Sequence, residues 1–461
     1  MTRAGGNHYS RKKQMVFRIF IPVLFIALVG SGVYLYWFSG FANKETDLTL
    51  PPGFKATVFA DNVGAARHIV VAPNGDVYVA VWDSEDKRGG VFGAQRGDDA
   101  GDSNKRGGVL ALRDTNGDGR ADIQERFGEE GGSGIALSGN SLYFATWTTV
   151  YRYELEPGKL VPVKPPEIVV GGFPRSGHSA RSLSVDESGA LFVNLAAPTN
   201  SCQEADTKLE SPGKDPCPEL ENFGGIWKFD ANRKNQKQSD GERYATGLRN
   251  IVALAFNQKD KNLYGAQHGR DHLIESFPKL FNAKQAAENA AEEFFRIERG
   301  SDYGHPYCYY NLELKKKVLA PEYGGDGKTV GRCAEKNMPL AAFPAHWAPN
   351  ALLFFTGSQF PARYKEGAFI AFHGSWFRTP FPQEGFNVVF VPFQNGQPTE
   401  NYEVFADGFA GTRKHPRSAN HRPTGLAQGT DGSLYVTDDK GGRIWRIYYT
   451  APVTNVPKGN K

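Results

Sequence analysis

The hydrophobic and polar positions of residues 50–450 repeat one pattern six times. Each copy has an apolar stretch, a polar turn that often contains glycine, and a second stretch rich in Tyr, Phe and Val. The first and last copies are HIVVAPNGDVYVAV and TGLAQGTDGSLYVTD, and the six begin at His68, Gly134, Arg181, Asn250, Ala351 and Thr424. Repeated units built on strand hairpins are typical of propeller blades. The sequence therefore predicts an all-β protein with a six-bladed β-propeller over residues 50–450.

Most copies continue into a third apolar stretch that ends beside a charge, as in GGVLALRD and GGIWKFD. FKATVFA, residues 54–60, is expected to supply the outer strand of the last blade and so to close the ring. A β-sandwich is the alternative architecture, but it gives no reason for near-identical units. Blade spacing predicts insertions at about 84–107, 199–224 and 275–345. The last contains AKQAAENAAEEFFRIE, whose period and composition predict a helix.

An uncharged stretch of twenty residues, 19–38, precedes the propeller. It is long enough to span a bilayer as one helix. Residues 1–18 carry five Arg and Lys side chains and no acid, which predicts that they stay in the cytoplasm. The sequence thus predicts a single-pass transmembrane anchor in the inner membrane, a linker at 39–49, a periplasmic propeller and a C-terminal tail at 451–461. The alternative for 19–38 is a cleaved signal peptide, which would also export the propeller.

Composition and charge narrow the class of protein further. The 53 glycines, 28 prolines and 13% aromatic residues suit many short strands joined by turns. The formal net charge is +4, but residues 1–18 alone carry +5, so the rest of the chain is close to neutral. We expect no nucleic-acid partner, because proteins that bind nucleic acid present a basic face to its phosphates.

Four cysteines lie in pairs around two loops, Cys202 with Cys217 and Cys308 with Cys333. Neither pair has metal-ligand spacing, and the chain has no CxxCH motif for covalent haem. Because an exported chain meets an oxidising compartment, the sequence predicts two local disulfides. Each would stabilise the fold by about 3 kcal/mol. The charged loop between Cys202 and Cys217 is expected to be a solvated surface insertion.

Charged, polar and aromatic residues lie where the chain enters the first strand of each copy. In a propeller these strands line the central channel and enter it from the same face, so we expect the preceding residues to converge on one mouth. They are Arg67, His68, Ser133, His178, Arg181, Arg249, Asn250, His346, Trp347 and Arg422. Several cations and imidazoles with a nearby indole predict a site for a flat anionic ligand. The alternative is that each arginine only pairs with a neighbouring acid.

At these residues the chain resembles the quinoprotein sugar dehydrogenases, the family of soluble glucose dehydrogenase and of the sorbosone and pyranose dehydrogenases that use pyrroloquinoline quinone. The resemblance covers about 45–450 and is strongest to the sorbosone dehydrogenase branch. It lies in GHSARSLSVDESGALFVN, GLRNIVALAF, QHGRDHL, DYGHPYCYYN, AFHGSWFR and RPTGLAQGTDGSLYVTDDKGGRIWRI. It implies a six-bladed propeller with the quinone and a calcium ion over the channel mouth.

The resemblance implies that His178 is the general base, which takes the proton of the sugar's anomeric hydroxyl while hydride passes to the quinone. It implies that Arg249 and Asn250 polarise the quinone carbonyl and stabilise the charge arriving on it. The other contacts expected with the cofactor are those of Arg422, on a carboxylate, and of Arg67, Arg181, Trp347 and Trp376.

The resemblance also implies the ligands of the calcium ion. Gly269 and Arg270 would supply backbone oxygens, with Asp271 beside them as a carboxylate. The chain departs from its relatives in two motifs, reading RNI for RNP and YGHP for YGWP, where His305 replaces the indole. The lysine and the second arginine that hold the quinone in soluble glucose dehydrogenase have no clear equivalents here.

A second calcium motif follows from the residues themselves. DTNGDGRADIQE, residues 114–125, matches the calcium-loop pattern D-x-[DN]-x-[DN]-G-x5-E at every specified position. The alternative is a turn rich in Asp and Asn without metal. No helix pair surrounds the loop, so we expect a structural calcium site. Its ligands would be Asp114, Asn116, Asp118, the carbonyl of Arg120, Asp122 and Glu125.

The sequence thus favours a membrane-anchored periplasmic oxidoreductase that oxidises the anomeric hydroxyl, or the aldehyde hydrate, of a sugar such as an aldose or sorbosone. Without a haem motif, its electrons would pass to a separate cytochrome or to membrane quinone. One alternative is a calcium-dependent lactonase or esterase, whose metal would be held by Glu, Asn and Asp side chains. Another is a non-catalytic propeller that only binds, but such a module does not need a base facing a carbonyl polariser.

Overall fold

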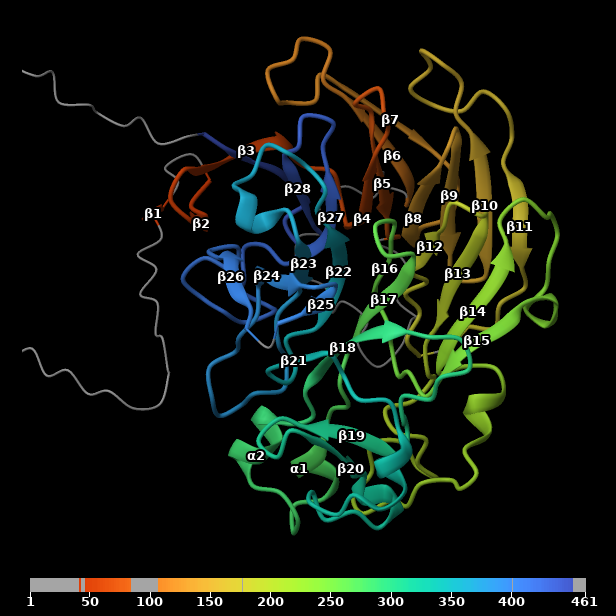
Figure 1. Cartoon of the computed structure of the whole chain (residues 1–461), viewed down its shortest axis with the longest axis vertical. Coiled ribbons are helices and arrows are strands. Elements are labelled where there is room, and N and C mark those ends of the chain that lie inside the picture. The colour runs from red at the N-terminus through yellow and green to blue at the C-terminus, as the bar shows by residue number, and fades with distance from the viewer. Residues whose placement is uncertain (1–40, 43–45, 84–106, 176, 400, 451–461) are drawn as a thin grey trace, which may run out of the picture. The chain divides into compact units, whose positions relative to one another are not determined.

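The structure is a computed structural model that describes residues 41–42, 46–83, 107–175, 177–399 and 401–450. Within these ranges six antiparallel sheets of four or five strands surround a common axis (Figure 1). Blade one contains β4 (Ala66–Val71), β5 (Val77–Val81), β6 (Gly108–Arg113) and β7 (Ile123–Phe127). Blade two contains β8 (Gly132–Ser138), β9 (Ser141–Thr146), β10 (Thr149–Glu154) and β11 (Glu167–Gly171). Blade three contains β12 (Leu183–Val185), β13 (Ala190–Leu195), β14 (Gly225–Asp230) and β15 (Glu242–Thr246).

Blades four to six follow the same order from the axis outward. Blade four contains β16 (Ala253–Asn257), β17 (Asn262–Gln267), β18 (Glu292–Ile297) and β21 (Ala341–Phe343). Blade five contains β22 (Pro349–Phe354), β23 (Gly367–Phe372), β24 (Asn387–Gln394) and β26 (Glu403–Ala406), with β25 (Gln397–Pro398) beside β24. Blade six contains β27 (Pro423–Gln428), β28 (Leu434–Asp438), β29 (Ile444–Tyr449) and β3 (Phe54–Ala60).

The first strands of the blades form a closed ring. β4, β8, β12, β16, β22 and β27 each contact the first strands of the two neighbouring blades. The ring closes as expected, because β3 pairs with β29 from Ala60 opposite Ile444 to Phe54 opposite Tyr449. The predicted six-bladed propeller is confirmed.

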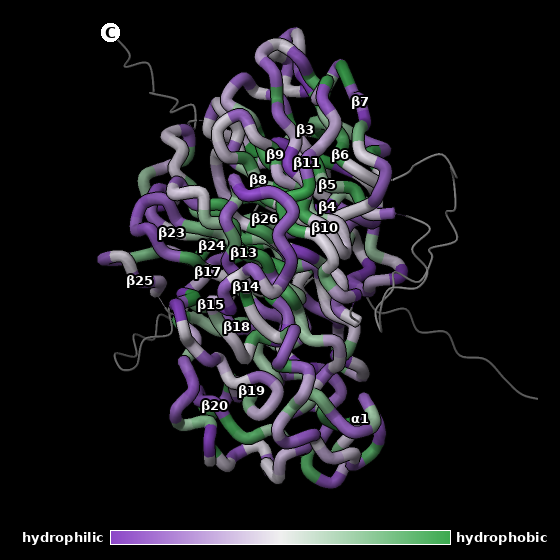
Figure 2. The backbone as a smooth tube through the Cα atoms, turned by 90° about the vertical axis from the view of Figure 1, so that its right-hand side faces the viewer, coloured by the Kyte–Doolittle hydropathy of each residue, from purple (hydrophilic) through white to green (hydrophobic). Residues whose placement is uncertain are grey.

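The hydrophobic core lies between the blades. Each of the six blade interfaces has its own cluster of buried apolar side chains. Strands near the axis are covered on both faces, so β5, β13 and β23 are buried at every position. Figure 2 shows the hydrophobic segments gathered on the strands and the hydrophilic segments in the connections. This double burial explains why the repeats are almost continuously apolar.

The predicted helix over residues 283–298 is wrong for its second half. A helix, α2, spans only Ala283–Glu288, and the chain then enters β18. Phe294 packs in the cluster between blades four and five, whereas Phe295 packs in the cluster between blades three and four. Alternate side chains thus serve opposite faces, which is the period of a strand. The expected insertion at 275–345 therefore contains the two outer strands of blade four.

The expected insertion at 84–107 lies outside the described residues except for residue 107. The insertion at 199–224 and the rest of 275–345 lie toward the bottom of Figure 1, outside the ring of blades. They contain α1 (Leu273–Ser276), α2 and the two-stranded ribbon of β19 (Cys308–Asn311) and β20 (Lys316–Leu319). Both predicted disulfides are present, Cys202–Cys217 and Cys308–Cys333.

The predicted membrane anchor, residues 19–38, lies outside the described residues, as do the tails 1–18 and 451–461. No helix in the part of the chain that the structure describes has the length and apolar character needed to cross a membrane. The predicted linker ends in packed structure, because Leu48 is buried in the cluster between blades five and six. There β2 (Thr49–Leu50) pairs with β1 (Phe41–Ala42).

Candidate active site at the channel mouth

Two sets of chain segments reach the same mouth of the channel. One set enters the first strands, and the other leaves the second strands, because an antiparallel second strand runs back toward its partner's start. Several first strands also carry a register shift at the mouth end, which turns side chains out of the regular alternation. These shifts lie in β4 between Ala66 and Ile69, in β8 between Gly132 and Gly134, in β22 between Pro349 and Ala351, and in β27 between Pro423 and Gly425.

His178 lies in the connection between β11 and β12. Its Nδ1 is 2.6 Å from the carbonyl oxygen of Ala197. Burial and the charge of Arg249 lower its pKa to about 4, so the imidazole is neutral at neutral pH. Because a carbonyl only accepts, Nδ1 carries the proton and Nε2 carries the lone pair. This is the tautomer that a general base requires.

Arg249 lies beside His178 and is surrounded by oxygen atoms. Its Nε and Nη2 donate to the backbone and side-chain oxygens of Asn200 at 3.2 and 3.1 Å. Nη1 donates to the carbonyl of Gly269 at 2.9 Å, and Nη2 also reaches Asp271 Oδ2 at 3.1 Å. The neighbouring Asn250 is buried, and its Oδ1 accepts from Asn194 at 3.4 Å.

Asp271 joins Arg249 to His346. Its Oδ1 is 2.9 Å from His346 Nδ1, and His346 Nε2 is 3.0 Å from the carbonyl of Ala286 in α2. Burial opposes charge on His346, but the hydrogen bond and charge of Asp271 outweigh it and raise the pKa of the imidazole. Burial likewise opposes charge on Asp271, yet its pKa is lowered by its hydrogen bond with His346 and by the charge of Arg249.

Glu292 lies behind this cluster at the start of β18. Its carboxylate oxygens accept from the backbone of Gly269 at 2.8 Å and of Ala348 at 3.0 Å. Burial raises the pKa of Glu292 to about 7, although both backbone hydrogen bonds act against that rise. Glu292 thus ties two mouth segments to blade four.

A second cluster lies where blades five, six and one meet. Asp439 accepts from Arg67 Nη1 at 2.6 Å and lies 2.8 Å from His373 Nε2. Burial and the charge of Arg422 lower the pKa of His373 to about 4. Arg422 donates to the carbonyls of His373 and Gly374 at 3.0 and 2.9 Å.

Arg422 differs from Arg67 and Arg249 in having no ion pair with an acid of the described chain. Burial is the main reason that its pKa falls to about 10, and the charge of Arg67 acts in the same direction. Its guanidinium lies over the indole of Trp376, 5.4 Å from the ring centroid. The alternative that each arginine pairs with an acid therefore holds for Arg67 and Arg249 but not for Arg422.

Two predicted contact residues are not presented at the mouth. Arg181 is only 1% exposed, and it donates to the carbonyls of Trp147 and Pro174 at 3.0 and 2.8 Å. It therefore braces the segment that leads to His178 instead of facing a ligand. Trp347 packs in the cluster between blades four and five, with its ring centroid 5.3 Å from that of Phe372. Both residues were predicted from their positions before a first strand, but a side chain at such a position can also be buried between two blades.

Other residues of the mouth lie outside the first-strand pattern. His373 and Asp439 directly follow the second strands β23 and β28, so the ends of second strands carried a signal that the first-strand pattern did not use. Asn200 had no such signal, because it lies in the expected insertion at 199–224, just before the loop that was expected to be solvated.

The loop at 114–125 has the hydrogen bonds of an Asx-rich turn. Asp114 accepts from the backbone of Gly117 and Gly119, both at 2.8 Å, and Asp122 accepts from that of Thr115 at 2.6 Å. Glu125 lies in β7, opposite Ala111 of β6. The structural calcium ion stays a prediction, with the ligand positions given above.

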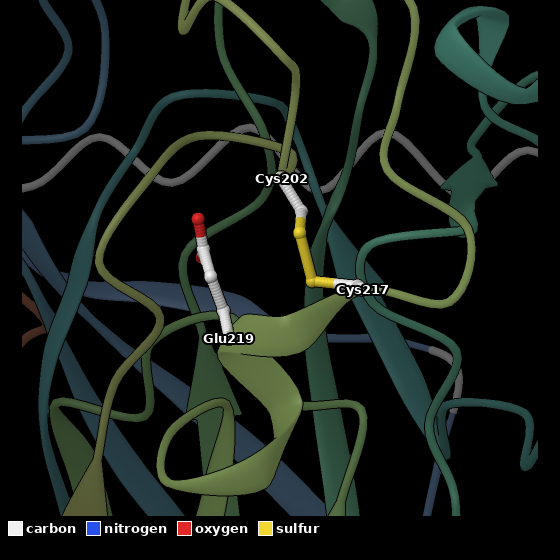
Figure 3. A group of neighbouring side chains, drawn as sticks. All are labelled: Cys202, Cys217 and Glu219. Atoms are coloured by element: carbon white, nitrogen blue, oxygen red, sulfur yellow. A yellow bond between two sulfur atoms is a disulfide. The ribbon is translucent and has the colours of Figure 1, made fainter.

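Among the described residues, one group brings three possible metal-binding side chains within 4.8 Å of one another: Cys202, Cys217 and Glu219. Figure 3 shows that the two sulfur atoms are joined in the disulfide. Glu219 lies in the short 3-10 helix η1 (Pro218–Glu221), and its Oε1 accepts from Thr199 Oγ1 at 2.7 Å. This group is therefore structural and not a metal site.

The residues at the mouth fit a flat anionic quinone and a calcium ion in their chemistry. Arg422 offers a guanidinium without an acidic partner against an indole, and Arg67 has a buried Nε without a hydrogen bond. Both features suit a ligand with carboxylates. The carbonyl of Gly269 and the carboxylate of Asp271 are ligands of the kind that calcium prefers, and here both accept from Arg249.

Comparisons with known proteins agree with the fold. The pyranose dehydrogenase PQQ domain of Coprinopsis cinerea, in its holo form, has a TM-score of 0.67 at 17% identity, covering 88% of this chain and 98% of that one. The calcium structure of Trichoderma reesei Carbohydrate-Active Enzymes Family AA12 has a TM-score of 0.69 at 19% identity, covering 89% and 99%. At these identities the likeness concerns the fold alone.

Sequence comparison adds a relative and a family. An uncharacterized protein of Borreliella burgdorferi is 27% identical over 276 residues, which are 59% of this chain and 61% of that relative. This chain thus matches less than two thirds of that relative's length. The sequence model of the TrAA12-like family matches residues 48–450, which is most of the chain, and the chain belongs to the TrAA12-like family.

Proposed function

We propose that this protein is a pyrroloquinoline quinone-dependent sugar dehydrogenase that oxidises the anomeric hydroxyl, or the aldehyde hydrate, of an aldose or of sorbosone. The observation that carries the proposal is the neutral His178, held in the tautomer of a base, beside the guanidinium of Arg249. Two structures with the same fold are described as a pyranose dehydrogenase PQQ domain and as a calcium structure of a carbohydrate-active enzyme family.

The proton of the substrate hydroxyl would be taken by Nε2 of His178. The hydrogen bond from Nδ1 to Ala197 keeps the ring in one orientation and keeps the lone pair on Nε2. Arg181 fixes the segment before the base by donating to Pro174. After transfer, the nearby carboxylate of Asp271 stabilises the imidazolium, as its charge raises the pKa of His178 against the effect of Arg249.

The quinone, when bound, would accept the hydride that leaves the anomeric carbon, and with it both electrons of the oxidation. Arg249 and Asn250 would hold its reacting carbonyl, and Arg67 and Arg422 its carboxylates, with Trp376 against its ring. A calcium ion would be held by the backbone oxygens of Gly269 and Arg270 and by Asp271.

The setting of the enzyme is part of the proposal. Residues 19–38 would anchor it in the inner membrane with the propeller in the periplasm, because the uncharged stretch follows a basic N-terminus. Its electrons would leave to a separate cytochrome or to membrane quinone. Fractionation that recovers the full-length chain from membranes would support the anchor, and a soluble form that begins near residue 43 would contradict it.

Reconstitution tests the activity. The purified protein is incubated with pyrroloquinoline quinone and calcium, and dye reduction is followed over a panel of aldoses and ketoaldoses. We expect reduction that requires both the quinone and a sugar. The same preparations are assayed without quinone for hydrolysis of lactones and esters. Hydrolysis without any sugar-dependent dye reduction would replace the dehydrogenase by the calcium-dependent lactonase or esterase.

A further inference from the structure

The loop that leads to the disulfide Cys202–Cys217 enters the channel mouth through Asn200, which is only 4% exposed. The Oδ1 atom of Asn200 accepts from Arg249 Nη2 at 3.1 Å and from the backbone nitrogen of Asp271 at 2.9 Å. Its Nδ2 donates to the carbonyl of Asp271 at 2.9 Å, and its own carbonyl accepts from Arg249 Nε at 3.2 Å. Asn200 therefore contacts both Arg249 and Asp271, which with His346 form the ion cluster beside His178.

We propose that Asn200 is a positioning residue that holds the guanidinium of Arg249 beside His178 and, through the same amide, fixes the backbone at Asp271. The proposal rests on the proposed function in one respect, namely that Arg249 acts on the quinone. The contacts themselves exist without the cofactor, so they can be tested without it.

An amide is suited to this position because it offers both an acceptor and a donor. The oxygen has two lone pairs, which serve the guanidinium and the backbone N–H of Asp271, while the nitrogen serves the backbone carbonyl of the same residue. Aspartate would place a carboxylate oxygen against that carbonyl, and alanine would leave buried groups without partners. Asn200 thus makes three hydrogen bonds that neither an ionised aspartate nor an alanine could make.

The surrounding loop holds Asn200 rigidly. The backbone nitrogen of Asn200 donates to Asp206 at 3.1 Å, and the disulfide begins two residues later (Figure 3). Between them, Ser201 donates to Glu322 at 2.9 Å, and Glu322 forms an ion pair with Arg270. The insertion therefore acts on the mouth from outside the propeller, as a clamp on the segment at Arg270 and Asp271.

The experiment compares Asn200→Ala with a control in the same loop. Gln203 is also buried, but its side chain bonds only within the loop, donating to Ser211 and accepting from Thr207. Gln203→Ala therefore removes hydrogen bonds from the loop without touching Arg249. If Asn200→Ala does not fold, Asn200→Ser, which removes less volume, takes its place.

The first readout needs no cofactor. The imidazole of His178 is titrated by NMR in the metal-free protein, with its signal assigned from His178→Gln. In Asn200→Ala we expect its midpoint to rise by about one pH unit, because Arg249 no longer stands fixed beside it. The second readout is a titration with pyrroloquinoline quinone, in which we expect about tenfold weaker binding and a lower kcat.

The outcomes separate the two proposals. If the parent protein neither binds quinone nor oxidises sugars, the proposed function fails, while the NMR titration still decides the role of Asn200. If a folded Asn200→Ala protein keeps the parental midpoint, Asn200 does not position Arg249, whatever the quinone data show. An equal shift in Gln203→Ala would also overturn the proposal, since the effect would then belong to the loop as a whole.

Discussion

The channel mouth contains two ion clusters of the same composition, an aspartate between an arginine and a histidine, yet the two histidines are shifted in opposite directions. The pKa is raised in His346, whereas in His373 it is lowered to about 4. The members are Arg249, Asp271 and His346 in one cluster and Arg67, Asp439 and His373 in the other.

Each histidine contacts an aspartate, so the direction of its pKa shift depends on whether that aspartate outweighs burial and the other nearby charges. His346 has a second acid nearby, Glu292, and it gives its other ring nitrogen to a backbone carbonyl. His373 has a second cation nearby, Arg422, which acts with burial to keep it neutral. The comparison shows that an aspartate partner alone does not fix the protonation state of a buried histidine, because burial and a nearby cation can outweigh it.

The two clusters also differ in what lies beside them. The Asp271 cluster adjoins His178 and the predicted calcium ligands, so we expect it to serve the chemistry. The Asp439 cluster adjoins Arg422 and Trp376, so we expect it to serve cofactor binding. We therefore expect substitutions near the Asp271 cluster to lower turnover and substitutions near the Asp439 cluster to weaken quinone binding.

The largest effect is expected for His178→Ala. Loss of the base should lower turnover by about 10² to 10⁴. The Asp439 side of the mouth is untouched, so the quinone should still bind with the parental affinity. The measurement is dye reduction against quinone concentration, with the sugar found to be active. Near-parental turnover at saturating quinone would show that another group is the base.

The next effect separates the two sides directly. Arg422→Ala should weaken quinone binding by about 10- to 100-fold, the loss of a charge-assisted contact, with turnover restored by excess quinone. Arg249→Ala should weaken binding and also lower turnover at saturation, because it acts on the reacting carbonyl. Thermal unfolding of both variants without quinone serves as the control. Equal losses of kcat in Arg422→Ala and Arg249→Ala would show that the two clusters do not differ in function.

The propeller could be predicted almost completely from the sequence. Strands near the axis are buried on both faces, so each blade appears in the sequence as a repeated apolar pattern. The error at residues 283–298 arose where a short helix, α2, runs directly into β18. AKQAAE favours a helix, and only the tertiary environment shows that Phe294 and Phe295 point into different blade interfaces. Local composition could not reveal that change of period.

The site could be predicted less fully. The position before a first strand indicated His178 and Arg249, which the structure places side by side. It could not distinguish a side chain that faces the mouth from one buried between blades, as Arg181 and Trp347 are. Asn200 comes from an insertion between strands of blade three, and the length and path of such a loop are set by contacts far along the chain. Its role needed the structure.

Opposite pH dependences are expected from the two histidines in the quinone- and metal-free protein. His346 has a raised pKa, so its contribution to stability is present below its unfolded-state value of about 6.5 and is lost as the pH rises through the folded value. His373 has a lowered pKa, so its contribution is present above about 6.5 and is lost as the pH falls toward about 4.

The measurement is urea unfolding of the parent, His346→Gln and His373→Gln at pH 5 and pH 8. Between these, the free energy of unfolding of the parent relative to His373→Gln should fall by about 2 kcal/mol on going to pH 5. Relative to His346→Gln it should change with the opposite sign. The exposed His415→Gln provides the control. The same sign for both histidines would mean that the two clusters do not differ as described.

The smallest effect is expected far from both clusters, in the predicted calcium loop at 114–125. Asp118 accepts from the backbone of Arg120 at 2.8 Å and would be one of the ligands of the ion. Asp118→Ala should lower the melting temperature by a few degrees in calcium buffer, about 1 kcal/mol, and by less with a chelator. The spectrum of bound quinone should not change, because no residue of the loop is among those that join the two mouth clusters. Equal melting of variant and parent in both buffers would leave the loop as a turn without metal, whereas an altered quinone spectrum would show that the mouth is coupled to the outer strands of blade one.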